Sequence, residues 1–82
     1  MLNGNAKKFS ETLVSLRKKA GLSQRQLADA LGVTESTIAN WENGRHKPRL
    51  LFWQFKAFCQ ALGIQKIDEI PDDLELVDSS DN

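Results

Sequence analysis

Residues 23–44 contain two short helix patterns separated by only a Gly-Val pair, and this spacing limits the folds open to the chain. The first pattern begins with the residues of a capping box, because Gln26 stands three positions after Ser23. The second pattern is capped by Thr34 and ends at Gly44. A two-residue connection forces the two helix axes to cross steeply, so the pair is predicted to form a helix-turn-helix.

Three further helix patterns flank this pair, over residues 6–20, 50–62 and 64–70. No run shows the sustained two-residue alternation of a strand, so the chain is predicted to be all-α with five helices. The fourth helix is the most apolar, and its inward side chains are expected to be Phe52, Phe55, Phe58, Cys59 and Leu62.

The 82 residues are expected to form one domain, at residues 6–70, between an N-terminal arm (1–5) and an acidic tail (71–82) that is partly disordered. One cysteine and one histidine are too few for a disulfide framework or a metal site. Neither a membrane span nor a signal peptide is present, which makes the cytoplasm the expected compartment. No cofactor is expected.

The formal net charge of zero hides a strong asymmetry along the chain. Residues 1–49 hold nine Lys and Arg against four Asp and Glu, a net charge of +5. Residues 50–82 hold two Lys against seven acids, a net charge of −5. A basic body with an acidic end is compatible with nucleic-acid binding, although two solvated surfaces without a role would show the same pattern.

The run GLSQRQLADALGVTESTIANWENGR resembles the DNA-binding core of the phage repressor and Cro-like helix-turn-helix family, also called the xenobiotic-response-element family. The matching features are the Gly-Leu-Ser-Gln entry, the Leu-Gly-Val turn and the closing Ile-x-x-Trp-Glu-x-Gly. With the flanking helices, the resemblance covers about residues 6–70. It implies a five-helix lambda-repressor-like domain that binds double-stranded DNA as a small, nucleoid-associated transcriptional regulator, in most cases a repressor.

The helix over residues 35–43 has two different faces on a wheel of about 100° per residue. Small and polar side chains share one face: Glu35, Ser36, Ala39, Asn40 and Asn43. The opposite face carries Thr37, Ile38, Trp41 and Glu42. The first face is too polar to be buried against protein, and its side chains are short enough to enter the major groove of DNA. An ordinary solvated face is the alternative.

In the family, the first two residues after the cap and one residue a turn later contact base edges, which implies this role for Glu35, Ser36 and Asn40. Asn can bond to adenine in two places, whereas Glu35 could accept from cytosine, orient Arg25 or favour the helix N-terminus electrostatically. Phosphate contacts are expected from residues that begin the second helix or follow the third: Gln24, Arg25, Asn43, Arg45, Lys47 and Arg49.

Glu42 lies on the core side of the wheel, where a carboxylate needs a partner. Arg17 borders the apolar stripe of the first helix, four residues after Leu13, and the family resemblance implies the same pairing. We therefore expect a structural Arg17–Glu42 ion pair that fixes the third helix to the rest of the domain.

The fourth helix has more large apolar residues than one face needs, which indicates either a wide core stripe or an association site. Because the family usually binds two-fold DNA sites as dimers, the homodimer candidates are Leu51, Trp53, Ile67 and Ile70.

The alternative function is an antitoxin-type module that also engages a protein partner. An enzyme is not expected, because no nucleophile–base pair, metal cluster or phosphate loop is present. The acidic tail could bind a basic partner, shield the DNA face or aid solubility.

Overall fold

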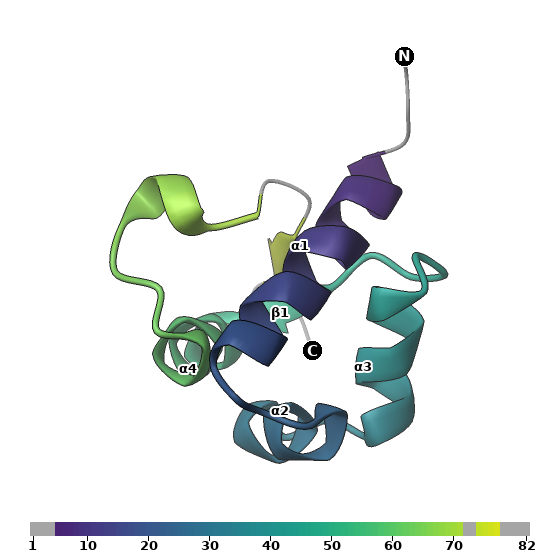
Figure 1. Ribbon diagram of the computed structural model, residues 1–82, viewed down its shortest axis with the longest axis horizontal. Coiled ribbons are helices and arrows are strands. Elements are labelled where there is room, and N and C mark those ends of the chain that lie inside the picture. The colour runs from purple at the N-terminus through teal and green to yellow at the C-terminus, as the bar shows by residue number, and fades with distance from the viewer. Residues whose placement is uncertain (1–4, 72–73, 78–82) are drawn as a thin grey trace.

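Four α-helices, one 3₁₀ turn and two short strands make up the part of the chain that the computed structural model describes, residues 5–71 and 74–77 (Figure 1). In chain order they are α1 (Asn5–Lys19), α2 (Gln24–Leu31), α3 (Glu35–Glu42), β1 (Arg49–Leu51), α4 (Phe52–Leu62), η1 (Ile67–Glu69) and β2 (Glu75–Val77). None of these helices combines the length and apolar character needed to cross a membrane.

The limits of α2 and α3 follow from their capping residues. The Ser23 side chain accepts a hydrogen bond from the Gln26 backbone N–H, and the Gln26 side chain accepts one from the Ser23 N–H, so the predicted capping box is present. Thr34 Oγ1 accepts from the Thr37 N–H at 3.1 Å and caps α3. Gly32 closes α2 at φ +67°, a left-handed conformation that glycine adopts without steric cost.

The core lies between all four helices and β1. Leu13 of α1, Leu27 of α2, Ile38 of α3, Leu50 of β1 and Phe58 of α4 are all fully buried. Each comes from a different element, so burial of these side chains holds the elements together.

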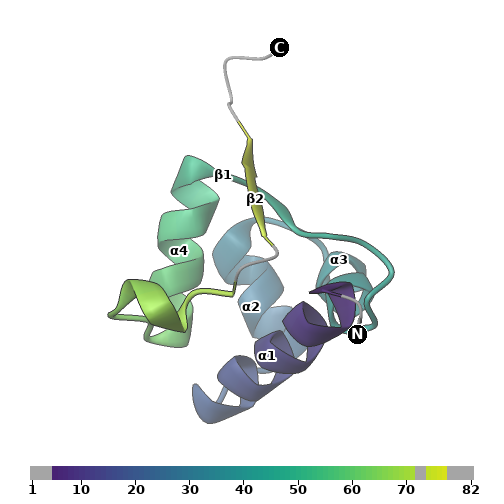
Figure 2. The ribbon, with the colours of Figure 1, turned by 90° about the horizontal axis from the view of Figure 1, so that it is seen from above.

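The expectation of an all-α chain is wrong in one respect, because β1 and β2 form a two-stranded parallel sheet. Arg49, Leu50 and Leu51 pair with Glu75, Leu76 and Val77, and Figure 2 shows the two strands side by side near the start of α4. β2 lies in the segment for which we expected an acidic tail, of which residues 72–73 and 78–82 lie outside the described residues. Strands of three residues are too short to show alternation, and their pairing joins distant segments.

The last two expected helices also differ from the observed elements. α4 begins at Phe52 rather than Leu50, because Leu50 enters the core as part of an extended strand. Phe52 therefore lies in the first turn of α4 and is 65% exposed, although it was expected to face inward. Instead of a fifth α-helix, the chain forms the three-residue turn η1, whose Glu69 carboxylate accepts hydrogen bonds from the Gln65 and Lys66 N–H groups.

Candidate nucleic-acid interface

α3 presents a polar face to solvent because its apolar residues are used by the core. Ile38 is fully buried and Trp41 is 5% exposed. On the other side of the helix, Glu35, Ser36 and the C-cap residue Asn43 are exposed, and Asn40 is half-buried. The three residues expected to read bases therefore share one accessible face, and Asn43 extends it.

The α2–α3 connection is held by hydrogen bonds to the last turn of α2. The Gly32 N–H donates to Asp29 O at 3.3 Å, and the Val33 N–H donates to Ala28 O at 3.0 Å. These bonds satisfy carbonyls that a helix end otherwise leaves unpaired. Figure 1 shows α2 and α3 meeting through this short connection at a steep angle, which is the arrangement expected from the sequence.

The expected ion pair between Arg17 and Glu42 is present and is bidentate. Arg17 Nε lies 2.6 Å from Glu42 Oε2, and Nη2 lies 3.1 Å from Oε1. Arg17 Nη1 also donates to Leu22 O at 2.9 Å. Only 12% of the Arg17 side chain and 6% of the Glu42 side chain are exposed. The guanidinium thus links the end of α1, the turn before α2 and the end of α3.

Gln24 belongs to the same hydrogen-bond network, and this contact was not expected from the sequence. Its Nε2 donates to Glu42 Oε1 at 2.9 Å. The family resemblance implies a phosphate contact for Gln24, and one of its two amide N–H groups already donates to a carboxylate within the protein. Glu42 therefore receives donors from both α1 and α2 and fixes α3 to each of them.

The protonation state of Glu42 follows from these contacts. Burial alone would raise its pKa, but the hydrogen bonds from Arg17 and Gln24, together with the positive charges of Arg17 and Lys18, lower the pKa below its ordinary value of 4.5. The hydrogen bond with Glu42 raises the pKa of Arg17 in spite of burial. Both groups are therefore charged at neutral pH.

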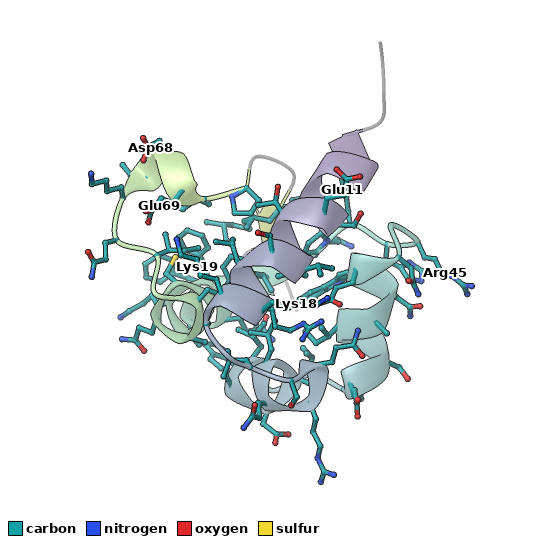
Figure 3. All side chains as sticks on the ribbon, in the orientation of Figure 1. Glu11, Lys18, Lys19, Arg45, Asp68 and Glu69 are labelled. Atoms are coloured by element: carbon teal, nitrogen blue, oxygen red, sulfur yellow. The ribbon has the colours of Figure 1, made fainter. Side chains whose placement is uncertain are left out.

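The basic residues expected to contact phosphates are exposed. Arg25 lies on α2, and Arg45 and Lys47 lie in the loop after α3. Figure 3 shows Arg45 pointing outward from the end of α3. Arg49 has a different environment, because Glu75 of β2 lies across the sheet with its Oε1 3.8 Å from Arg49 Nε. This acidic neighbour was not expected, because it depends on the strand pair that no local pattern predicts.

Acidic side chains of η1 lie away from this basic loop. Figure 3 shows Asp68 and Glu69 on the opposite side of the view from Arg45. Hydrogen bonds from the Gln65 and Lys66 N–H groups lower the pKa of Glu69, so its carboxylate is ionised at neutral pH. Within the described ranges, no three or more His, Cys, Asp or Glu side chains are grouped to hold a metal.

The homodimer candidates do not form one cluster. Leu51 and Trp53 lie at the start of α4, whereas Ile67 and Ile70 follow its C-terminal end. Figure 2 shows η1 beside that C-terminal end and the strands at the other. Trp53 is 53% exposed and Ile67 is 87% exposed. Two exposed apolar residues were not among the candidates, Phe52 at 65% and Leu76 at 49%, because Phe52 was expected to face inward and Leu76 was assigned to the acidic tail.

The steeply crossed pair α2 and α3, with a polar face on the second helix and a basic loop behind it, defines a helix-turn-helix domain. A family model described as helix-turn-helix matches residues 13–54. An uncharacterised HTH-type transcriptional regulator of Methanothermobacter thermautotrophicus is 41% identical over 54 residues, which are 66% of this chain and 75% of the relative. The crystal structure of the clp gene regulator ClgR from C. glutamicum has a TM-score of 0.65 at 25% identity, and the match covers 82% of this chain and 83% of that chain.

The chain belongs to the Cro and phage-repressor type of helix-turn-helix family, whose members are DNA-binding transcriptional regulators. The family expected from the sequence is thus confirmed. The fold is mostly helical with a small sheet rather than a five-helix bundle.

Proposed function

We propose that this protein binds a specific double-stranded DNA site through α3 in the major groove and represses transcription by occupying that site. The observation that carries the proposal is the division of α3 into a buried side and an accessible face of short polar side chains. The major groove admits one helix, and its base edges offer hydrogen-bond partners to such a face.

The roles on α3 follow from side-chain chemistry. Asn40 can bond to adenine N6 and N7, and Ser36 can donate to or accept from a base edge. Glu35 is an acceptor and fits the amino group of cytosine, and it also lies in the first turn of α3, where a negative charge is favourable. We assign base reading to these three residues.

Phosphate contacts are assigned to the residues around the reading face. Arg25, Asn43, Arg45 and Lys47 are exposed and carry hydrogen-bond donors. Gln24 has one remaining amide N–H for a phosphate oxygen. Arg49 is the sixth candidate, and the nearby Glu75 carboxylate lowers the positive potential at this end of the loop.

A comparison of Asn40→Ala with Arg45→Ala tests this division of roles, after a binding site has been selected from random DNA. Asn40→Ala should lose preference at one base position, because its contact depends on base identity. Arg45→Ala should weaken binding to all sequences and reduce the slope of log affinity against log salt by about 1. Equal losses on every sequence from both variants would contradict the assignment of Asn40.

We further propose that the protein binds a two-fold site as a homodimer. Support comes from the exposed apolar side chains at both ends of α4, since such side chains often lie in association surfaces. Sedimentation equilibrium with and without DNA should show a dimer that Ile67→Ser or Trp53→Ser weakens, whereas the exposed control Gln65→Ser should leave it unchanged. A monomer on DNA would contradict this part of the proposal.

The same exposed apolar side chains favour one alternative, a regulator that also binds another protein, as an antitoxin does. This alternative predicts that the chain co-purifies with the product of a neighbouring gene and melts at a higher temperature in that complex. A plain regulator should be equally stable without any partner.

A further inference from the structure

The side-chain amide of Gln54 joins the start of α4 to the end of α2. Its Oε1 accepts from the Leu51 N–H at 2.8 Å, and its Nε2 donates to Leu31 O at 3.0 Å. Leu51 is the N-cap residue of α4, and Leu31 is the last residue of α2. The final carbonyls of a helix have no partner within that helix. The Gly32 and Val33 N–H groups bond to the Asp29 and Ala28 carbonyls, and Gln54 provides the donor for the Leu31 carbonyl.

The ring of Trp53, the residue before Gln54, lies close to the next residue of the connection. Gly32 follows Leu31 at φ +67°, and Cη2 of Trp53 would lie 3.0 Å from a Cβ atom placed on this glycine. Gln54 is thus bonded to Leu31, and the ring of the preceding residue, Trp53, leaves little room for a side chain at Gly32. α3 begins only three residues after Gly32, at Glu35, so these contacts act on the segment that sets its direction.

α3 is therefore held at its two ends by different contacts. Its C-terminal end is fixed through Glu42, which binds Arg17 and Gln24. Its N-terminal end, which carries Glu35 and Ser36, follows the connection that Gln54 and Trp53 contact. An eight-residue helix is about 12 Å long, so a rotation of about 10° about one end moves the other end by about 2 Å. Hydrogen bonds to base edges tolerate only a few tenths of an ångström.

We propose that Gln54 is a positioning residue for DNA recognition, which fixes the N-terminal end of α3 through its hydrogen bond to the Leu31 carbonyl. This inference rests on the proposed function. Loss of the bond allows the N-terminal end of α3 to shift while Glu42 still holds the other end. Base preference then falls at the positions that Glu35 and Ser36 contact and is retained at the position that Asn40 contacts. Flexible Arg and Lys side chains can follow such a shift, so binding to random DNA is preserved.

Gln54→Glu tests the proposal because it separates the two bonds of the side chain. A carboxylate still accepts from the Leu51 N–H but cannot donate to Leu31 O. Gln60→Glu is the matched control, since Gln60 is exposed on the same helix and the charge change is identical. The measured quantity is the ratio of affinities for the selected site and a random duplex, at one salt concentration and at a temperature where circular dichroism shows each variant folded.

Gln54→Glu should lower this ratio at least about tenfold relative to Gln60→Glu, because the base contacts of Glu35 and Ser36 are both weakened, with random-duplex affinities equal within about twofold. An unchanged ratio, even with a lower melting temperature, would overturn the positioning role and leave the proposed function intact. If the wild-type protein prefers no sequence over random DNA, the proposed function fails and the positioning role with it.

A second variant keeps the test decisive if Gln54→Glu does not fold. Gln54→Lys removes the acceptor for Leu51 but keeps a donor for Leu31 O, and Gln60→Lys is its control. The ratio for Gln54→Lys should stay within about twofold of the control, because the bond to α2 is retained. A tenfold loss in this variant would overturn the proposal.

Discussion

Removing the carboxylate of Glu42 should destabilise the domain strongly, because this group accepts three hydrogen bonds from two other helices. The bonds to Arg17 and Gln24 have lengths of 2.6 Å, 3.1 Å and 2.9 Å, and 6% of the Glu42 side chain is exposed. In the wild-type protein only 12% of the Arg17 side chain is exposed, and in Glu42→Ala its guanidinium loses both bonds to the carboxylate and keeps only its bond to Leu22 O. Removing one partner of a buried pair costs about 3–5 kcal/mol, and the retained bond places the expected loss near 3 kcal/mol.

The chain offers a matched control in its exposed ion pair. Arg49 Nε and Glu75 Oε1 are 3.8 Å apart, and the two side chains are 68% and 58% exposed. Exposed pairs contribute about 0–1 kcal/mol, so Glu75→Ala should lower the free energy of unfolding by less than about 1 kcal/mol. The same carboxylate-to-methyl change thus has very different expected costs in two environments.

Urea unfolding measures both variants. Circular dichroism reports the helices, and tryptophan fluorescence reports opening of the core, because Trp41 is 5% exposed and loses its buried environment whereas Trp53 is already 53% exposed. The two transitions should coincide, with a lower midpoint and an unchanged slope for Glu42→Ala. The double variant Arg17→Met/Glu42→Leu should be more stable than Glu42→Ala, because it leaves no buried charge unpaired. If Glu42→Ala loses no more stability than Glu75→Ala, the ion pair does not fix α3.

Three further measurements follow from other local features. The pKa of Glu42 is lower in the folded protein than in the unfolded chain, so the stability that its carboxylate contributes is present above the unfolded-state pKa and is lost as pH falls through the folded-state pKa. The difference in free energy of unfolding between wild type and Glu42→Gln should therefore be largest at neutral pH and shrink below pH 4.5. Gly32→Ala and Gly63→Ala should each cost about 1–2 kcal/mol for a left-handed residue, at φ +67° and +68°. Gly32→Ala should cost on the order of 1 kcal/mol more in thermal unfolding, because the Trp53 ring must move only there; equal costs would exclude a firm Trp53 contact. Thr34→Ala should lose about 1 kcal/mol, and Thr34→Ser, which keeps the capping hydroxyl, should lose much less.

The parts of the fold that depend on local chemistry could be predicted from the sequence. Caps at Ser23 and Thr34 and the left-handed stop at Gly32 involve residues within one or two turns, so the spacing of residue types reveals them. The helix wheel of α3 likewise separated the buried Ile38 and Trp41 from the accessible polar face. The Arg17–Glu42 pair spans 25 residues, and it was expected because a carboxylate on the core side of a helix needs a cation.

The features that were missed depend on contacts between distant segments. The β1–β2 pair places the extended residues 49–51 beside residues 75–77, and no local pattern in either segment specifies the other. Phe52 was misplaced because α4 begins at this residue, two positions later than expected. Gln24 and Gln54 were missed for a related reason, because a neutral amide can be satisfied by water and gives no sign of needing a partner.

The parallel strand pair has a consequence for the order in which the domain folds and opens. β1 and β2 join segments 26 residues apart with only three residues on each side, so their pairing requires closure of a long loop for few hydrogen bonds. The helix-turn-helix, with its short connection and complete caps, requires far less loop closure. We therefore expect β2 to form last during folding, and its amide protons to exchange with solvent by a local opening that leaves the amides of α2 and α3 protected.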